Sequence, residues 1–226
     1  MKKLCIPSLF ILAFALHVAE LPLAANVIFS DLGSPATYST STAWVVRGSG
    51  FFSPSVTQAQ QFTAGVGGSV TQVDLAVGND GQNVVNTFYA SIWTNSGNLP
   101  GVQIQGARWD LIATRFWTTC CSVISVVNVS GVRLNAGENY FMVLGPLSLS
   151  DNSLNAWNMN DQGVLALDLF SFDGGSNWMS NGPRIIGAFE ILGVPTPEPS
   201  SILLLGTALL GSFRIIRRRS VGARPN

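Results

Sequence analysis

Histidine and lysine are almost absent from this sequence. The only histidine is His17 and the only lysines are Lys2 and Lys3, so residues 26–195 contain neither residue type. Without histidine this segment cannot form a Ser-His-Asp or Cys-His catalytic arrangement, and it lacks the commonest zinc ligand. We expect no catalytic residue, no bound metal and no cofactor there.

Basic charge is scarce as well. Residues 26–195 hold five arginines against ten acidic residues, which leaves a formal net charge of −5. A nucleic-acid site needs lysine and arginine clustered in a patch that neutralises phosphates, and this segment has no such cluster. The charge pattern therefore predicts no nucleic-acid partner.

The first 25 residues have the organisation of a secretory signal peptide. Lys2 and Lys3 come before an apolar run from 4 to 18, and Ala24 and Ala25 provide small residues at its exit. This run of about 15 residues is shorter than the roughly 20 that span a bilayer. The pattern predicts a signal helix that directs the chain to the Sec translocon and is cleaved near Ala25. A retained membrane anchor is the alternative.

The C-terminal residues show three features in a fixed order. Pro197-Glu198-Pro199 lies in a proline-rich spacer that excludes helix and sheet pairing. An uncharged apolar run follows from 200 to 213, and arginines after it would stop a single membrane helix with the body outside and the basic end in the cytoplasm. These stop residues are Arg214, Arg217, Arg218 and Arg219.

This tail resembles the PEP-CTERM sorting signal of Gram-negative bacteria in its Pro-Glu-Pro motif, its apolar helix and its arginine cluster. The resemblance implies a partner, an exosortase-type membrane enzyme that processes the tail near the motif. It also implies an inner-membrane intermediate, followed by delivery to the cell envelope, the cell surface or the extracellular matrix. A plain single-span anchor is the alternative. We assign the sorting segment to 194–219 and a short cytoplasmic tail to 220–226.

Between the two ends, apolar and polar residues alternate in many short segments, as in half-buried β-strands. Turn signals rich in glycine and asparagine separate these segments, and none shows a sustained helical period. The pattern predicts an all-β domain over 26–193, an antiparallel β-sandwich of jelly-roll type. The expected strands are 43–52, 59–63, 69–78, 87–94, 107–112, 123–129, 139–144, 164–170 and 184–192.

The middle of the chain also resembles the extracellular sandwich modules called choice-of-anchor domains. The resemblance rests on 61–63 with 73–77, on 91–101 and on 134–144, and it spans roughly 57–190. It implies the same sandwich fold and does not imply an activity.

Cys120 and Cys121 are neighbours, and Cys5 lies in the predicted signal peptide. In an oxidising compartment the pair could form a vicinal disulfide, either as a structural bond that stiffens a turn or as a redox-labile site, because neighbouring Cα atoms lie closer than in most disulfides. The alternative is that one side chain packs inward and the other outward along a strand. Similar modules often carry a Cys-Cys pair here, so the resemblance favours the structural bond.

Residues 171–178 fit the pattern Ser-x-Asp-x-Gly-x-x-Trp. The pattern resembles the Asp-box hairpins of sialidases and other secreted β proteins, and a single copy indicates a folding device. We expect Asp173 to accept hydrogen bonds from turn amides, Gly175 to take a positive φ and Trp178 to cover the hairpin.

The sequence has six tryptophans and three tyrosines. Sugar rings stack on exposed aromatic faces, and we single out Trp93, Trp117 and Trp157 as a candidate glycan platform. Packing inside the core is the alternative for each of them. Calcium could bind at 79–80 or at 151–152, although turn formation explains the Asp and Asn side chains there equally well.

Together these features predict an exported, non-enzymatic structural or interaction protein of the bacterial envelope or exopolysaccharide matrix. The first alternative is a carbohydrate-binding module with an exposed Trp/Tyr platform. A glycan hydrolase is less favoured, since it needs two carboxylates about 5 to 9.5 Å apart. The structural or interaction protein would bind exopolysaccharide or other surface proteins, whereas both alternatives imply a glycan ligand.

Overall fold

The computed structural model describes residues 26–80 and 86–195, so the predicted signal peptide, residues 196–219 of the sorting segment and the predicted cytoplasmic tail lie outside it. The described residues form strands and no helix, and thus no helix long and apolar enough to cross a membrane. The strands are β1 (Asn26–Ser30), β2 (Ala43–Arg47), β3 (Thr57–Thr63), β4 (Gly68–Leu75), β5 (Val77–Asn79), β6 (Thr87–Ser96), β7 (Leu99–Ile112), β8 (Ile124–Val127), β9 (Arg133–Leu134), β10 (Asn139–Gly145), β11 (Leu154–Asn158), β12 (Leu165–Ser171), β13 (Met179–Ile185) and β14 (Phe189–Pro195).

These strands form three sheets in which all strand ladders are antiparallel. The largest sheet has the order β13-β12-β3-β10-β6-β7. The second has the order β1-β14-β4-β8, with β9 also paired to β4, and the third has the order β2-β11-β5. The all-β, antiparallel prediction is confirmed, while jelly-roll connectivity stays a prediction.

Successive side chains of a strand point to opposite faces of the sheet, and those of the largest sheet form two apolar cores, one on each face. On β10, Tyr140, Met142 and Leu144 belong to the main core. Phe141 and Val143 belong to a second, smaller cluster on the opposite face. Each fully buried large apolar side chain stabilises the fold by about 1.5–3 kcal/mol relative to leaving it exposed.

Aromatic contacts join the sheets across the main core. Phe62 of β3 meets Phe189 of β14 edge to face, with ring centroids 5.5 Å apart. The small cluster on the other face is covered by Trp93 and Trp178. The Arg108 guanidinium also lies 3.9 Å from the centroid of the Tyr89 ring, which belongs to that cluster. The outer face of the largest sheet is therefore largely occupied.

The hairpin of β6 and β7 is longer than the sequence predicts. The strands predicted at 87–94 and 107–112 leave a long connection between them, but β6 continues to Ser96 and β7 begins at Leu99. Only Gly97 and Asn98 form the turn, with φ angles of 61° and 64°. A two-residue hairpin turn of type I′ needs positive φ at both central residues, so the flanking residues can remain in strands.

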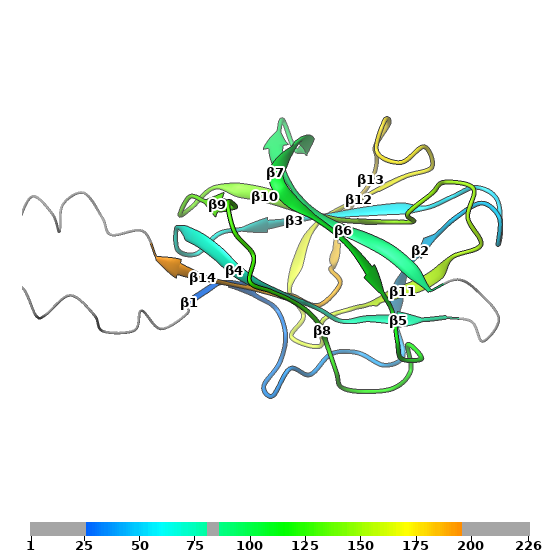
Figure 1. The fold of residues 1–226 in the computed structure, drawn as a ribbon, viewed down its shortest axis with the longest axis horizontal. Helices are drawn as coiled ribbons and strands as arrows, with labels where there is room; N and C mark the ends of the chain where they lie inside the picture. The colour runs from blue at the N-terminus through cyan, green and yellow to red at the C-terminus, as the bar shows by residue number, and fades with distance from the viewer. Residues whose placement is uncertain (1–25, 81–85, 196–226) are drawn as a thin grey trace, which may run out of the picture.

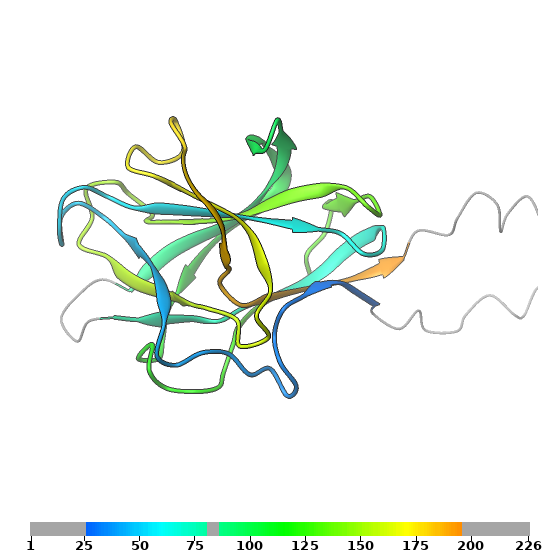
Figure 2. The same ribbon diagram turned by 180° about the vertical axis from the view of Figure 1, so that it is seen from behind.

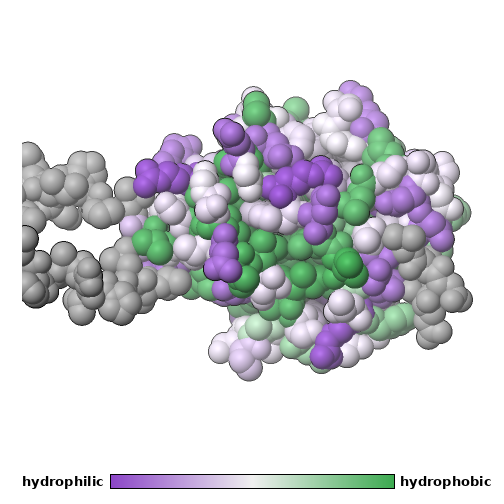
Figure 3. Space-filling model, viewed as in Figure 1, coloured by the Kyte–Doolittle hydropathy of each residue, from purple (hydrophilic) through white to green (hydrophobic). Residues whose placement is uncertain are grey.

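The side of the body where β7 and β8 lie keeps apolar surface. Each of these strands is at the edge of a different sheet. Figure 3 shows an apolar area across the middle of this face, where Figure 1 places β6 and β8. Half-buried Trp109, Leu111 and Ile124 pack against the main core, so the core reaches the surface between the two edges.

The two ends of the described body lie side by side. Asn26 at the start of β1 pairs with Gly193 of β14, and β14 continues to Pro195. The sheet β2-β11-β5 lies at the opposite end of the body, as both views show (Figures 1 and 2). A tether that begins after Pro195 would therefore hold the body with β2 on the far side.

Candidate functional site

Trp157 is a core residue. It is fully buried on β11, its Nε1 donates to the Ala188 carbonyl at 3.2 Å, and its ring centroid lies 5.8 Å from that of Phe189. It pairs in register with Trp44 of β2, so both side chains lie on the core face of the three-stranded sheet. The prediction that Trp157 belongs to an exposed platform is wrong, because its strand turns the ring inward.

Trp93 is half-buried and helps to cover the smaller core. Its Nε1 donates to Ser91 Oγ at 2.8 Å, and its ring lies edge-on to Trp178 with centroids 6.4 Å apart. Neither of the two grooves described below includes it. Its ring therefore serves packing, and its role in glycan binding stays a prediction.

Trp117 stands beside a groove on the outer face of the three-stranded sheet. A row of small residues crosses β2, β11 and β5 on this face, namely Val45, Ala156 and Gly78. The Trp117 backbone passes over Gly78, where a Cβ would lie only 2.4 Å from Trp117 Cα. Glycine permits this close approach, and the small side chains beside it leave a trough next to the indole.

This Trp117 groove has a volume of about 320 Å³. Its floor is apolar, and its polar groups are the hydroxyls of Ser41 and Thr42 and the carboxyl of Asp80. Partial burial raises the pKa of Asp80 above its usual value. Among the described residues, the lining is Ser41, Thr42, Ala43, Val45, Asp80, Trp117, Ala156 and Met159.

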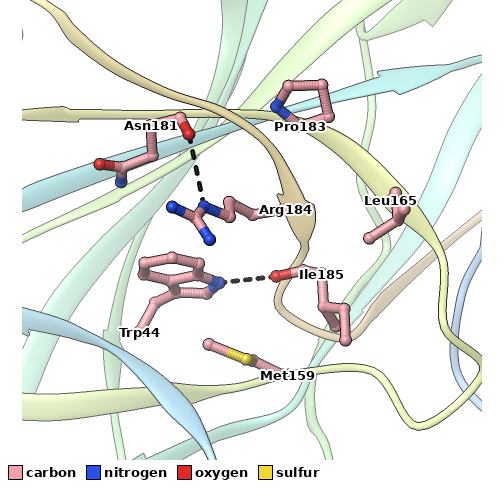
Figure 4. Close-up of a pocket in the computed structure, with 7 residues that line it drawn as sticks. All are labelled: Trp44, Met159, Leu165, Asn181, Pro183, Arg184 and Ile185. Atoms are coloured by element: carbon pink, nitrogen blue, oxygen red, sulfur yellow. Dashed lines mark hydrogen bonds between the residues drawn. The ribbon is translucent and has the colours of Figure 1, made fainter.

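A second, larger groove lies on the other side of β2, where the Trp44 indole is fixed by a hydrogen bond of 2.9 Å from its Nε1 to the Ile185 carbonyl (Figure 4). Arg184 Nε donates to the Asn181 carbonyl at 3.3 Å. This Trp44 groove has a volume of about 490 Å³ and is lined by Trp44, Met159, Leu165, Asn181, Pro183, Arg184 and Ile185. Met159 lines both grooves, so they meet at the end of β11.

A buried polar chain supports Asn181. Its Nδ2 donates to Asp168 Oδ2 at 2.6 Å, and Gln60 Nε2 donates to Asp168 Oδ1 at 3.1 Å. Gln60 Oε1 accepts from the Gly187 amide at 2.6 Å. Burial raises the pKa of the fully buried Asp168, while the two amides and the nearby Arg184 charge act in the opposite direction. Both carboxylate oxygens are thus bonded to side-chain amides.

Sequence analysis did not single out Trp44, Asn181 or Arg184. Trp44 lies within an expected strand, and the Asn181 segment precedes one, so neither position differs from ordinary strand or turn residues. The signal that could have found the groove is Arg184 itself. It is one of only five basic residues in 26–195, and it is flanked by the apolar Pro183 and Ile185.

The two places considered for calcium have different surroundings. The Asp151 carboxylate accepts hydrogen bonds from the backbone amides of Ser148 and Ser153, at 3.2 and 3.0 Å, and thereby closes the turn before β11. Asp80 lies in the Trp117 groove. Within 26–80 and 86–195, no three His, Cys, Asp or Glu residues are grouped as ligands of a metal ion.

Cys120 and Cys121 are joined by a disulfide in the segment between β7 and β8. The Tyr38 hydroxyl lies 3.3 Å from the Thr119 carbonyl and 3.1 Å from the Ser122 carbonyl. Cys121 also packs against a third apolar cluster, which consists of Tyr38, Ala76 and Ala188. The bond therefore lies in a loop that is anchored to the body on both sides.

The Asp-box hairpin has the predicted contacts. The Asn177 amide donates to Asp173 Oδ1 at 2.8 Å, and the Gly175 amide donates to Ser171 Oγ at 2.8 Å. Gly175 has a φ of 97°, and the Trp178 ring packs beside it. Hydrogen bonds from Asn177 and Ser171 lower the pKa of Asp173 to about 2. The prediction of a local folding device is confirmed in each of these contacts.

Residues 195–219 match the PEP-CTERM protein-sorting motif. The match includes Pro197-Glu198-Pro199 and the four stop arginines, and it confirms the resemblance of the tail. The motif means that the chain is exported, is processed by an exosortase at a membrane and proceeds to the cell surface. No curated protein and no solved structure matches this chain.

Proposed function

We propose that this PEP-CTERM protein is a non-enzymatic interaction protein of the cell envelope or exopolysaccharide matrix, which binds polysaccharide through the two grooves beside β2. Its tail delivers the β-rich body to the outside, and the body supplies the contact with the matrix. In this proposal the protein is a carbohydrate-binding component of the matrix and leaves the sugar chain intact.

The observation that carries the proposal is the placement of the grooves relative to the chain ends. β1 and β14 pair at one end of the body, and the sorting motif begins at Pro195, the last residue of β14. The sheet that contains β2 lies at the opposite end (Figure 1). A body held through its C-terminal tail would present β2 and its grooves away from the membrane, toward extracellular polymers.

The lining of both grooves suits sugar rings. A glycan site combines an aromatic face, which contacts the C–H groups of the sugar, with a few fixed polar groups that bind its hydroxyls. Trp44 lies beside Asn181 and Arg184 in one groove, and Trp117 lies near Asp80 and Thr42 in the other. Because the two grooves adjoin, they would contact more than one sugar unit of a polysaccharide.

The carboxylates near the grooves favour binding without cleavage. Glycoside hydrolysis uses a pair of carboxyl groups, one on each side of the scissile bond. Asp80 is the single carboxyl group that lines the Trp117 groove, and none lines the Trp44 groove. The buried Asp168 is bonded to Gln60 and Asn181, so it is not free to act on a ligand.

The proposal is tested by mixing the purified full chain, kept in detergent, with polysaccharide extracted from the envelope of the producing bacterium. Co-sedimentation measures binding, and a reducing-end assay measures cleavage. We expect saturable binding and no new reducing ends. Release of reducing ends would contradict the non-enzymatic role, and failure of the chain to sediment with the polymer would contradict the binding role.

A further inference from the structure

We propose that the Trp44 groove binds an acidic sugar of a polysaccharide, with the sugar ring on the Trp44 indole and its carboxylate paired with the Arg184 guanidinium. The inference rests on the proposed function and adds the chemical class of the ligand. It concerns this groove alone, and the Trp117 groove would contact neighbouring sugars of the same polymer.

Arg184 is a cation without an ion-pair partner. Among the described residues, the single ion pair joins Arg108 to Asp110 at 3.4 Å. Arg184 uses its Nε to bond the Asn181 carbonyl, and no hydrogen bond joins its two terminal nitrogens to another described residue. A guanidinium whose terminal nitrogens are both unbonded can bind a carboxylate through two parallel hydrogen bonds.

The charge of Arg184 is unusual for its surroundings. Residues 26–195 carry a formal net charge of −5, which repels anionic polymers at long range, yet the groove lining contains Arg184 and no acidic residue. Asp168 lies behind Asn181, and amides occupy both of its oxygens. Arg184 is exposed, so its charge is accessible to a ligand, and a cation beside an apolar groove favours an anionic ligand over a neutral one.

The groups that would contact the sugar are held in place before it arrives. The Trp44 indole is fixed by the Ile185 carbonyl, and Arg184 by the Asn181 carbonyl, as Figure 4 shows. The guanidinium lies between Asn181 and the Trp44 ring in that view. Asn181 is itself held by Asp168. Because these side chains are already ordered, binding loses less conformational entropy than it would at a mobile site.

The remaining lining fits the body of a sugar. Met159, Leu165, Pro183 and Ile185 supply apolar contacts for C–H groups. The volume of about 490 Å³ lies within the range of about 300–1,000 Å³ that is typical of small-molecule sites. A carboxylate can accept both parallel hydrogen bonds of the guanidinium fork, so a uronic acid is the ligand we infer. The fork also binds tetrahedral anions, and the sulfated probe below distinguishes a sulfate ester from a carboxylate.

The experiment is calorimetric titration of the full chain in detergent with three probes: an oligogalacturonate, its carboxyl-reduced neutral product and a sulfated oligosaccharide of similar length. We expect the oligogalacturonate to bind at least about tenfold more tightly than the neutral product, and the sulfated probe to bind less tightly than the oligogalacturonate. Arg184→Gln should remove the preference for the acidic probe. The control Arg133→Gln makes the same charge change on β9 and should keep the preference.

Four results would overturn the inference. These are equal binding of the acidic and neutral probes, tighter binding of the sulfated probe, equal losses in Arg184→Gln and Arg133→Gln, and no binding of any probe. If the native envelope polysaccharide still binds when one of these results is found, the proposed function is retained and only the inference about the acidic sugar is overturned. If the native polysaccharide does not bind either, the proposed function is contradicted as well. If Arg184→Gln does not fold, Arg184→Lys keeps the charge but lacks the fork, and unchanged acidic preference in it would contradict the bidentate contact.

Discussion

Asp31 shows how a single buried residue controls stability in this fold. Its side chain is 1% exposed, and Oδ1 accepts from the Phe189 amide at 2.7 Å, while Oδ2 is buried without a hydrogen-bond partner in the described residues. Burial raises its pKa to about 8 from an ordinary value of 3.8. The folded protein therefore keeps this carboxyl protonated at pH 7, where the unfolded chain has lost the proton.

The predicted consequence is a pH-dependent stability. Between pH 4 and pH 8 the unfolded chain binds fewer protons than the folded one, so the free energy of unfolding falls as the pH rises, by on the order of 4 kcal/mol. Asp31→Asn keeps a neutral side chain at all pH values and should flatten this profile and be more stable than wild type at pH 8. Urea denaturation at pH 4, 6 and 8 measures the free energy of unfolding of both proteins. The exposed Glu138→Gln should retain the wild-type slope, and a flat wild-type profile would contradict the account.

At the same scale, the tryptophans show what the sequence could and could not specify. Trp157 and Trp117 each follow an apolar residue and precede a polar one, and the sequence alone gives no reason to separate them. The surroundings of the two side chains differ because Trp157 pairs with Trp44 on the core face of β11, whereas Trp117 lies in a loop that crosses β5. The pairing register decides exposure, and register depends on contacts between distant segments.

At the scale of elements, Gly187 joins β13 to the core. A Cβ at this position would lie 2.5 Å from Trp157 ring atoms, and its amide donates to buried Gln60. Gly187→Ala should therefore destabilise the protein by about 1–3 kcal/mol through overpacking. Gly65→Ala is the matched control, since its Cβ would be 3.5 Å from the nearest atom. Equal chemical denaturation midpoints for the two variants would argue against this packing constraint.

The Asp-box hairpin between β12 and β13 depends on Asp173. Asp173→Ala removes the acceptor for the Asn177 amide, so this amide should lose protection while the rest of the fold is retained. In the wild type, the Asn177 amide should be protected from hydrogen exchange above pH 4. This protection should fall as the pH approaches 2, because the pKa of Asp173 is lowered to about 2. Amide exchange by NMR reports both effects. The exposed Glu138→Ala should leave Asn177 protected, and a protected Asn177 in Asp173→Ala would oppose this role.

β4 and β10 were both found from the sequence, near the limits that the structure gives them. Burial alternates along the first part of β4, whereas β10 is buried on both faces and its alternating side chains enter two different apolar clusters. β11 escaped detection because all five of its residues are buried and two of them are asparagines, so it has no alternation. The single strand predicted over 184–192 is wrong, because β13 ends at Ile185 and β14 begins at Phe189 in another sheet. β13 also contains Gly182-Pro183 at a sheet edge, where an edge strand tolerates proline. The Trp44 groove is lined by residues of β2, β12 and β13 and by Met159, which follows β11. Four of its seven lining residues come from β13, whose first five residues lie outside the predicted strand.

At the scale of the whole molecule, the sorting motif determines the destination of the body. Replacing Pro197, Glu198 and Pro199 by alanine should block exosortase processing, because the enzyme acts near this motif. We expect a product of higher mass that stays with the membrane fraction. Mass spectrometry and cell fractionation of the variant and the wild type measure this. Identical mass and distribution would contradict the role of the motif.

The central claim is that the end of the body opposite its chain termini binds polysaccharide. Hydroxyl-radical footprinting of the full chain, with and without native envelope polysaccharide, tests this claim at the level of side chains. The account predicts that the polymer protects Trp44, Trp117 and Met159 and leaves Trp93 and Trp109 as reactive as before. Unchanged labelling of the groove residues in the presence of bound polymer, or protection confined to Trp93 and Trp109, would contradict it.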